Sequence, residues 1–131
     1  MLKLSDVSVS YGRFQALKGI NLEVNEGELV VLLGANGAGK STIFRTISGL
    51  NKPTNGTIHF NDKPVHGSSP NYMVSAGVIH CPEGRKLFPQ MTIQENLVMG
   101  AYVIRKNKEE VKRNMEKVYE LFPILREKKN D

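Results

Sequence analysis

The stretch Gly34-Ala35-Asn36-Gly37-Ala38-Gly39-Lys40-Ser41-Thr42 matches the phosphate-loop pattern G-x-x-x-x-G-K-S/T at every fixed position. Before it, residues 28–33 form an apolar run that is typical of a strand buried on both faces of a parallel sheet. After it, residues 41–48 predict a helix. A glycine-rich loop between such a strand and a helix predicts a nucleotide-binding site.

Each part of this stretch has a physical role in binding phosphate. Its glycines allow backbone angles that turn successive N–H groups toward one anion. The start of the helix adds a partial positive charge, and Lys40 can reach the terminal phosphates. The Ser41 hydroxyl can ligate Mg²⁺, and Thr42 is expected to donate to the innermost phosphate. The alternative, a glycine-rich turn with a surface lysine, is disfavoured because motif and context both match.

Length and composition predict one globular domain. The chain has 131 residues, of which 40% are hydrophobic and 24% are charged, and it has no apolar run long enough to span a bilayer. The amino terminus lacks the apolar stretch of a signal peptide. Cys81 has no second cysteine to pair with, which agrees with a reducing compartment. We therefore expect a cytoplasmic protein.

The net charge of +5 raises the question of nucleic acid binding, because basic residues outnumber acidic ones over residues 84–131. In that region the charges alternate in sign. A solvated helix face is the better interpretation, and we expect no nucleic acid partner.

The part before the phosphate loop predicts an antiparallel sheet. Residues 2–10 alternate roughly between apolar and polar, and residues 17–24 do so more clearly. Tyr11 ends the first of these strands, 23 residues before Gly34. Its ring could stack on an adenine, although a tyrosine at a strand end more often packs against its neighbours.

Turn signals divide the next part of the chain. Asn55-Gly56 predicts a hairpin turn, with residues 57–60 as the returning strand. Ser69-Pro70 predicts the start of a short helix that ends at Gly77. Residues 78–81 then predict a further buried strand. The loop after it, residues 82–85, is a second candidate for chemistry, because ligands of open α/β sheets lie beyond the carboxyl ends of the strands.

The remainder predicts helices. Thr92 and Glu95 form a capping box that starts a helix running toward Ile104. A second helix over residues 109–122 carries an apolar stripe that usually faces a core. The stripe consists of Val111, Met115, Val118 and Phe122. Pro123 is expected to end this helix and leave a polar tail over residues 126–131.

Two stretches imitate functional motifs. Residues 51–54, Asn-Lys-Pro-Thr, resemble the N-K-x-D motif of GTPases, but Thr54 has no carboxylate to pair with guanine. His80 and Cys81 suggest a metal site, yet neighbours on a strand point to opposite faces. Two buried strand residues are the better interpretation.

With these residues placed, the whole chain resembles the ATP-binding subunit of ABC transporters, and most of all the subunit of branched-chain amino acid importers. The resemblance rests on residues 9–12 (Val-Ser-Tyr-Gly), 34–42, 82–85 (Pro-Glu-Gly-Arg) with 87–89 (Leu-Phe-Pro), 91–97 (Met-Thr-Ile-Gln-Glu-Asn-Leu) and 119–123 (Tyr-Glu-Leu-Phe-Pro). The first two stretches are family-wide, and the others indicate the subfamily.

The resemblance implies ATP and Mg²⁺ as ligands and assigns roles to individual residues. Tyr11 is the aromatic residue that stacks on adenine. Lys40 and Glu83 take part in catalysis, and Ser41 and Glu83 lie at the Mg²⁺ site. The segment around Glu83 links that site to the membrane partner. Most ABC ATPases carry glutamine at this position, and the glutamate fits the branched-chain group.

The chain departs from the family because it lacks an L-S-G-G signature and an acidic pair after an apolar strand. We therefore expect a truncated α/β fold: a P-loop NTPase core of the ABC ATPase kind, an antiparallel β subdomain and the start of a helical subdomain. Residues 1–131 are interpreted as the amino-terminal part of one ATP-binding domain, with the phosphate loop at 34–42 and the helical region at 92–131.

This interpretation predicts how the protein behaves alone and in its complex. The isolated chain is expected to be inactive as an ATPase and to self-associate through strands that lack neighbours. The complete subunit is expected to hydrolyse ATP beside transmembrane permease subunits and a second ATP-binding subunit, on the inner face of the cell membrane. Two alternatives stay open: a non-catalytic nucleotide-binding or interaction fragment, and an ABC ATPase without a transporter.

Overall fold

The structure is a computed structural model that describes residues 1–84 and 86–131. Arg85, part of the predicted loop over residues 82–85, lies outside the described residues. The chain divides into two units, Met1–His80 and Cys81–Asp131.

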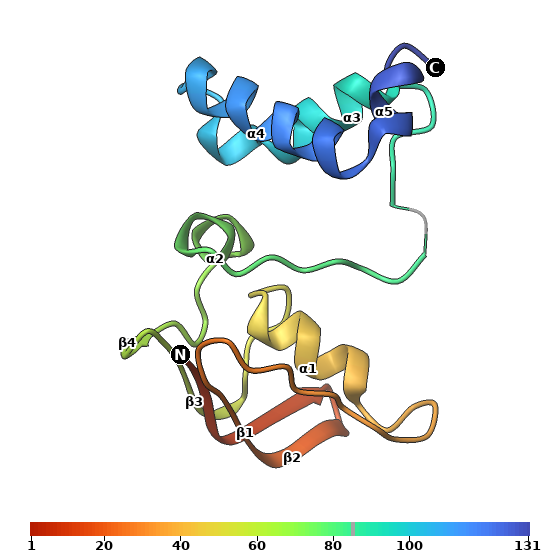
Figure 1. The fold of residues 1–131 in the computed structure, drawn as a ribbon. Helices are drawn as coiled ribbons and strands as arrows, with labels where there is room; N and C mark the ends of the chain where they lie inside the picture. The colour runs from red at the N-terminus through yellow and green to blue at the C-terminus, as the bar shows by residue number, and fades with distance from the viewer. Residues whose placement is uncertain (85) are drawn as a thin grey trace. The chain divides into compact units, whose positions relative to one another are not determined.

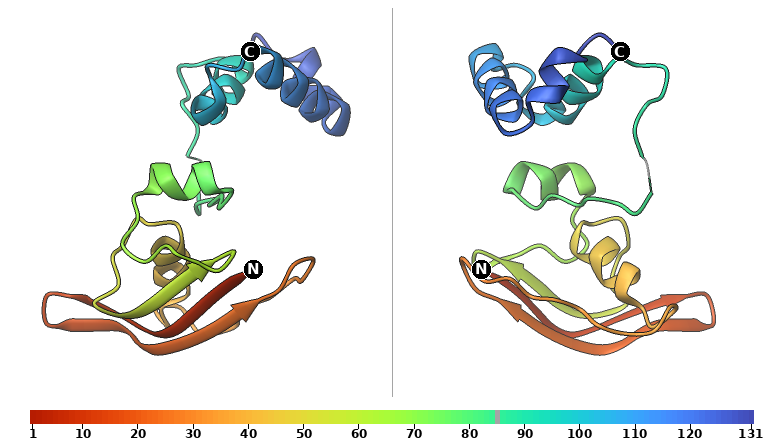
Figure 2. Two further views of the ribbon diagram at one scale, coloured as in Figure 1. Left: turned by 90° about the vertical axis from the view of Figure 1, so that its left-hand side faces the viewer. Right: turned by 45° about the vertical axis from the view of Figure 1, so that its right-hand side comes forward.

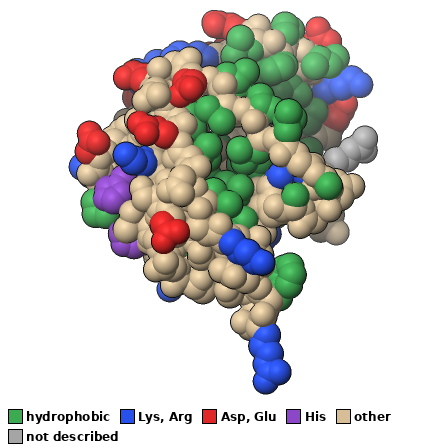
Figure 3. Space-filling view, turned by 90° about the horizontal axis from the view of Figure 1, so that it is seen from below, with side chains coloured by type: hydrophobic (Ala, Val, Ile, Leu, Met, Phe, Trp, Pro, Cys, Tyr) green, Lys and Arg blue, Asp and Glu red, His purple; other side chains and the backbone are tan. Residues whose placement is uncertain are grey.

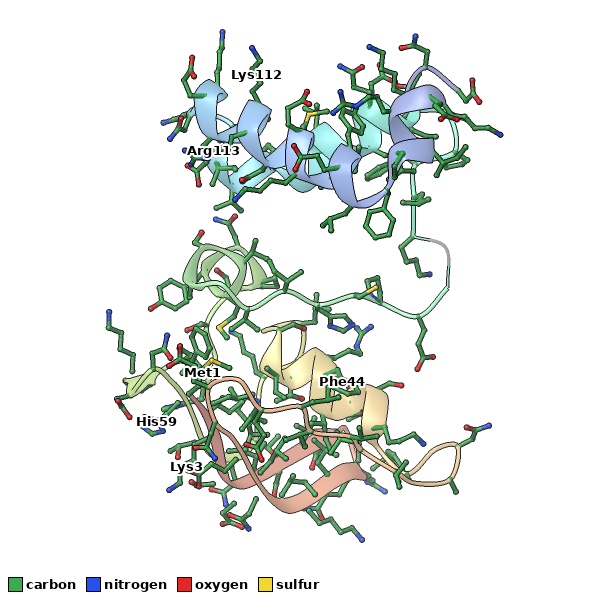
Figure 4. The ribbon with its side chains drawn as sticks, in the orientation of Figure 1. Met1, Lys3, Phe44, His59, Lys112 and Arg113 are labelled. Atoms are coloured by element: carbon green, nitrogen blue, oxygen red, sulfur yellow. The ribbon has the colours of Figure 1, made fainter. Side chains whose placement is uncertain are left out.

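The first unit is built on an antiparallel sheet, as the alternating sequence predicts (Figure 1). Among the described residues this sheet has four strands in the order β2-β1-β3-β4. The strands are β1 (Leu2–Tyr11), β2 (Phe14–Val24), β3 (Asn55–Phe60) and β4 (Lys63–Pro64). Lys3 of β1 and His59 of β3 are register partners, and their side chains lie at the same end of the sheet (Figure 4).

The core of this unit lies between the sheet and the helices α1 (Lys40–Ile47) and α2 (Pro70–Ala76), and α1 lies across one face of the sheet (Figure 2). Leu4, Val7 and Val9 of β1 are almost completely buried. The alternation of β1 is interrupted at Asp6, whose φ of 52° marks a bulge between Leu4 and Val7. Met73 of α2 completes the core.

The predicted hairpin turn at Asn55-Gly56 is wrong. Both residues lie inside β3, which pairs with β1. Gly56 has a φ of 83°, and a Cβ atom there would lie 2.2 Å from the carbonyl oxygen of Asp6. The glycine is therefore needed for the close approach of the two strands at the bulge. The hairpin turn is instead Asn61-Asp62, where both residues have positive φ, between β3 and β4.

The predicted buried strands 28–33 and 78–81 are not strands among the described residues. Leu29, Val31 and Leu33 are 89%, 67% and 91% exposed, whereas Leu32 packs against the core. In the second segment Val78 packs against the core, while Ile79 is 73% exposed. Each segment therefore buries one face and leaves the other uncovered.

The second unit is helical, as predicted, and consists of α3 (Ile93–Gly100), the 3₁₀ turn η1 (Tyr102–Ile104), α4 (Lys108–Leu121) and α5 (Pro123–Glu127). The predicted capping box is confirmed: the Glu95 N–H donates to Thr92 Oγ1 at 3.2 Å, and the Thr92 N–H donates to Glu95 Oε2 at 2.8 Å. Asn107 caps α4 by accepting from the Glu110 N–H at 3.1 Å.

Two expectations for the second unit need correction. Three residues of the predicted apolar stripe, Val111, Met115 and Val118, lie on α4 and are only half-buried, and Phe122 follows the end of α4 and is 57% exposed. The buried residue of α4 is Tyr119. Pro123 ends α4 but also begins α5, because proline suits the first turn of a helix. Lys112 and Arg113 project from α4 and are exposed, in agreement with a solvated face (Figure 4).

Candidate functional site

The predicted phosphate loop leads directly into α1. Gly37 and Gly39 have φ values of 84° and 92°, in the left-handed region that favours glycine. The Ala38 N–H donates to the Ala35 carbonyl at 3.2 Å, and the Ile43 N–H donates to Gly39 at 3.0 Å. The loop is therefore a closed turn, and Gly39 is the N-cap of the helix.

Close packing against β2 fixes the end of this loop. A Cβ atom on Gly39 would lie 2.8 Å from Leu17 Cδ2 and 3.1 Å from the Ala16 carbonyl oxygen. Leu17 is only 2% exposed and belongs to the core, so it cannot move away easily. Glycine is therefore required at position 39 both for its backbone angle and for its size.

Lys40 folds back over the loop. Its Nζ atom donates to the carbonyl oxygens of Gly34 and Ala35, at 2.5 and 2.7 Å. The ammonium group is thus held beside the turn and at the positive end of α1. All residues of α1 are described, and its first turn contains no acidic residue. The local charge is positive, which suits a phosphate.

The other predicted loop residues are placed around this charge. Asn36, Ala38 and Ser41 are exposed, so ligands can reach the loop from solvent. Ser41 follows Lys40 in the first turn of α1, and Thr42 is half-buried beside it. The structure therefore brings Gly34, Gly37, Gly39, Lys40, Ser41 and Thr42 together, as the motif predicts.

Tyr11 lies near the same loop. It is the last residue of β1 and pairs with Phe14 of β2. Phe14 lies two residues before Ala16, and the loop packs against Ala16 at Gly39. Two residues of a strand span about 7 Å. The Tyr11 side chain is half-exposed, and its hydroxyl accepts a hydrogen bond from Asn51 Nδ2 at 2.5 Å.

Glu83 belongs to the second unit, Cys81–Asp131. It lies exposed in a bend after Pro82. In the described part of the chain, no group of three or more His, Cys, Asp or Glu residues could hold a metal ion. The predicted pairing of Ser41 with Glu83 at one Mg²⁺ stays a prediction.

Two contacts of the first unit were missed by reasoning from sequence. Asn51 reaches Tyr11 across 40 residues of chain, and no local pattern signals such a contact. His80 was predicted as a buried strand residue, but its Nδ1 lies 3.0 Å from Ser48 Oγ. Cys81, predicted to be buried, is exposed.

Comparison with known proteins identifies relatives over nearly the whole chain. Residues 17–130 match the family described as ABC transporter. The high-affinity branched-chain amino acid transport ATP-binding protein BraG of Pseudomonas aeruginosa is 40% identical over 98% of this chain and 54% of its own length. The xylose/arabinose import ATP-binding protein XylG of Sulfolobus acidocaldarius is 38% identical over 95% of this chain and 50% of its own length. The chain thus spans about half the length of these relatives.

Solved structures of ATP-binding subunits and cassettes also match this chain. The ATP-binding subunit of an ABC transporter matches with a TM-score of 0.83 and 28% identity, over 100% of this chain and 53% of that one. A dimeric ATP-binding cassette with ADP and Pi bound matches with a TM-score of 0.69 and 28% identity, over 88% of this chain and 55% of that one. In the described part of the present chain, the helices are all too short or too polar to cross a bilayer.

Proposed function

Because this chain belongs to the ABC transporter family, we propose that it forms the amino-terminal part of the ATP-binding subunit of an importer. Residues 1–131 make up part of one ATP-binding domain, with the phosphate loop at 34–42 and the helical region at 92–131. This proposal is supported by the matched relatives, a transport ATP-binding protein and an import ATP-binding protein, both about twice the length of the part that this chain matches.

The phosphate loop binds the phosphates of ATP and ADP. The observation that supports this most directly is the position of Lys40, the first residue of α1. Its Nζ atom lies 2.5 Å from the carbonyl oxygen of Gly34, at the start of the loop. A phosphate placed there receives a charge-assisted hydrogen bond from the lysine and hydrogen bonds from the loop N–H groups. Tyr11 is half-exposed and supplies an aromatic ring for the adenine. Its register partner Phe14 is two strand residues from Ala16, which the loop contacts.

Mg²⁺ accompanies the nucleotide. It prefers oxygen ligands, and the exposed Ser41 in the first turn of α1 fits this requirement because it carries a hydroxyl next to Lys40. When bound, Mg²⁺ neutralises charge on the phosphates. Ser41 and Glu83 are proposed as the residues of this chain that act at the metal site.

Glu83 is proposed to act in transport-coupled hydrolysis. This role is supported by the match to the ABC transporter family, which covers residues 17–130 and therefore includes Glu83. In the complete subunit, Glu83→Ala should lower coupled ATP turnover more than it lowers nucleotide affinity. Glu83→Gln keeps the shape of the side chain and separates the effect of charge from that of size. Unchanged coupled turnover in both variants would remove Glu83 from the site.

The transported substrate is proposed to be a branched-chain amino acid. The stretches at residues 82–89 and 91–97 and the 40% identity to BraG support this assignment. The partners are then transmembrane permease subunits and a second ATP-binding subunit, at the cytoplasmic face of the membrane. Uptake assays with the complete importer test the assignment, since transport of a sugar such as xylose in place of leucine would contradict it.

Turnover by the isolated chain is not expected. The aspartates are Asp6, Asp62 and Asp131, and none follows an apolar strand where it could polarise water. Asp6 lies in the β1 bulge, and Asp62 lies in the β3–β4 turn. We therefore propose that the isolated chain, residues 1–131, binds nucleotide without hydrolysing it. Sustained phosphate release from a preparation free of other ATPases would contradict this.

Titration calorimetry tests the binding proposal. The chain should bind ATP and ADP, and Lys40→Ala should weaken both by about tenfold to a hundredfold, because a charge-assisted hydrogen bond is lost. Lys52→Ala is the matched control: it removes an exposed lysine that lies outside the loop. Equal affinities in wild type and Lys40→Ala would overturn the role of Lys40.

A further inference from the structure

Asn51 is fixed where it can control the ring of Tyr11. The Asn51 side-chain amide donates to the Tyr11 hydroxyl at 2.5 Å, across 40 residues of chain. A tyrosine at a strand end can otherwise choose among several side-chain rotamers. A hydrogen bond at the far end of the ring selects the rotamer that reaches Asn51.

The segment that carries Asn51 is itself held at both ends. The Leu50 and Asn51 N–H groups donate to the Arg45 carbonyl of α1, at 2.8 and 3.1 Å. Thr54 donates through its N–H and its hydroxyl to the Ser8 carbonyl of β1, at 2.8 and 3.1 Å. Asn51 is therefore tied both to the helix that follows the phosphate loop and to the strand that ends at Tyr11.

This arrangement relates the ring to the loop. α1 starts at the phosphate loop with Lys40, and Asn51 follows the end of α1. The hydrogen bond between Asn51 and Tyr11 therefore links the position of the tyrosine ring to the helix that also carries Lys40. Tyr11 is 49% exposed, which leaves ring surface available to a ligand. A group that must stack on a base benefits from being held in place before binding.

We propose that Asn51 is a positioning residue for the nucleotide base: it acts through the hydroxyl of Tyr11 to hold the ring in the orientation that stacks on adenine. This inference rests on the proposed function, because it assumes that Tyr11 meets the base of a nucleotide bound at the phosphate loop. It assigns Asn51 no contact with the nucleotide itself. Loss of Asn51 should therefore affect binding of the base and leave binding of the phosphates intact.

Calorimetry with two ligands tests this proposal on the full chain. ATP carries the base, whereas inorganic tripolyphosphate carries only the phosphates. Asn51→Ala should lower the affinity for ATP by about three- to tenfold, the effect of one hydrogen bond, and leave the affinity for tripolyphosphate unchanged. Tyr11→Phe keeps the ring and removes the hydroxyl, so it should give the same loss. Asn55→Ala is the control, because its exposed amide bonds to Asp6 instead.

The double variant separates a positioning role from a general structural one. If Asn51 acts through the hydroxyl, Asn51→Ala combined with Tyr11→Phe should lose no more ATP affinity than either change alone. Additive losses, an equal loss of tripolyphosphate affinity, or unchanged ATP affinity would each overturn the proposal. In the free protein, Tyr11→Phe should also shift the NMR signals of the Asn51 side-chain amide, and unshifted signals would contradict the bond.

Different results would contradict nucleotide binding at the phosphate loop and the role of Asn51. Binding of tripolyphosphate with no preference for ATP would remove the base from Tyr11 and overturn the Asn51 proposal, while leaving the phosphate loop in place. Binding of neither ligand by the wild-type chain would overturn both proposals. Binding of ATP with no effect of Asn51→Ala would overturn the Asn51 proposal alone.

Discussion

The Oγ atom of Ser48 lies 3.0 Å from Nδ1 of His80, so the segment after α2 is joined by a side-chain hydrogen bond to the end of α1. Ser48 is 7% exposed, and His80 is half-buried. If either side chain is removed, the other loses its hydrogen bond, and water replaces that bond only in part because the site is largely buried. This bond thus anchors the segment 78–80 to the helix that follows the phosphate loop.

A double-mutant cycle measures this anchor. Ser48→Ala and His80→Ala should each lower the free energy of unfolding, and the double variant should lose about 0.5–1.5 kcal/mol less than the sum of the two. Urea unfolding followed by circular dichroism gives the values. His66→Ala is the control, since His66 is exposed and should not couple to Ser48. Additive effects of Ser48 and His80 would show that the bond contributes nothing.

The fit of Gly39 against Leu17 predicts a difference between two glycines. Gly39 and Gly67 both have positive φ, but a Cβ atom on Gly67 would meet nothing within 4 Å. Gly39→Ala should therefore lower the free energy of unfolding by about 1–3 kcal/mol more than Gly67→Ala, because only the first substitution also overpacks the core. Equal losses in urea unfolding would mean that the loop does not rest on Leu17.

The hydrogen bonds that cap α2 and α3 predict local effects. Thr92→Ala should speed amide hydrogen exchange in α3, because a helix cap contributes about 1 kcal/mol. Ser69 caps α2 by accepting from the Tyr72 N–H at 3.2 Å, so Ser69→Ala should speed exchange in α2 instead. Faster exchange in both helices after either change would contradict separate caps.

The uncovered face of residues 28–33 predicts self-association. Leu29 and Leu33 are 89% and 91% exposed, and exposed hydrophobic side chains are visible in the space-filling view (Figure 3). Extended backbone with an apolar face invites pairing with another chain. Wild type should form larger species as concentration rises in gel filtration with light scattering. Leu29→Lys should reduce this association, and Leu50→Lys, at another exposed leucine, should not.

A monodisperse monomer at all concentrations would contradict this prediction. The result would mean that the apolar face is tolerated in water despite its exposure. Slow amide exchange over residues 28–33 in such a monomer would further show that the segment is protected within a single chain.

Some parts of the fold could be predicted because the chemistry that forms them is local. Thr92 and Glu95 cap a helix within four residues of sequence, and the glycines of the phosphate loop set its turn directly. The segment 28–33 was predicted as a strand from its apolar run. A strand also needs a hydrogen-bonded neighbour, and in the part of the chain that the structure describes no strand pairs with this segment.

Other parts could not be predicted because they depend on distant contacts. The sequence Asn-Gly usually marks a turn, but here Asn55 and Gly56 belong to β3. The bulge at Asp6 of β1 requires a glycine opposite it, because a Cβ atom on Gly56 would overlap the Asp6 backbone. For the same reason the contact of Asn51 with Tyr11 has no local signature. In the candidate site, the loop residues followed from the motif, whereas the support around them came from the folded structure.

NMR mapping tests whether the phosphate loop binds nucleotide. On addition of ADP with Mg²⁺, the backbone amide signals of residues 34–42 should shift most, because the proposed function has these N–H groups donate to the phosphates. Signals from α3, which serve as the internal reference, should stay in place, and Lys40→Ala should weaken the response. Unchanged signals over residues 34–42 at saturating ADP, or equal shifts throughout the chain, would contradict binding at the phosphate loop.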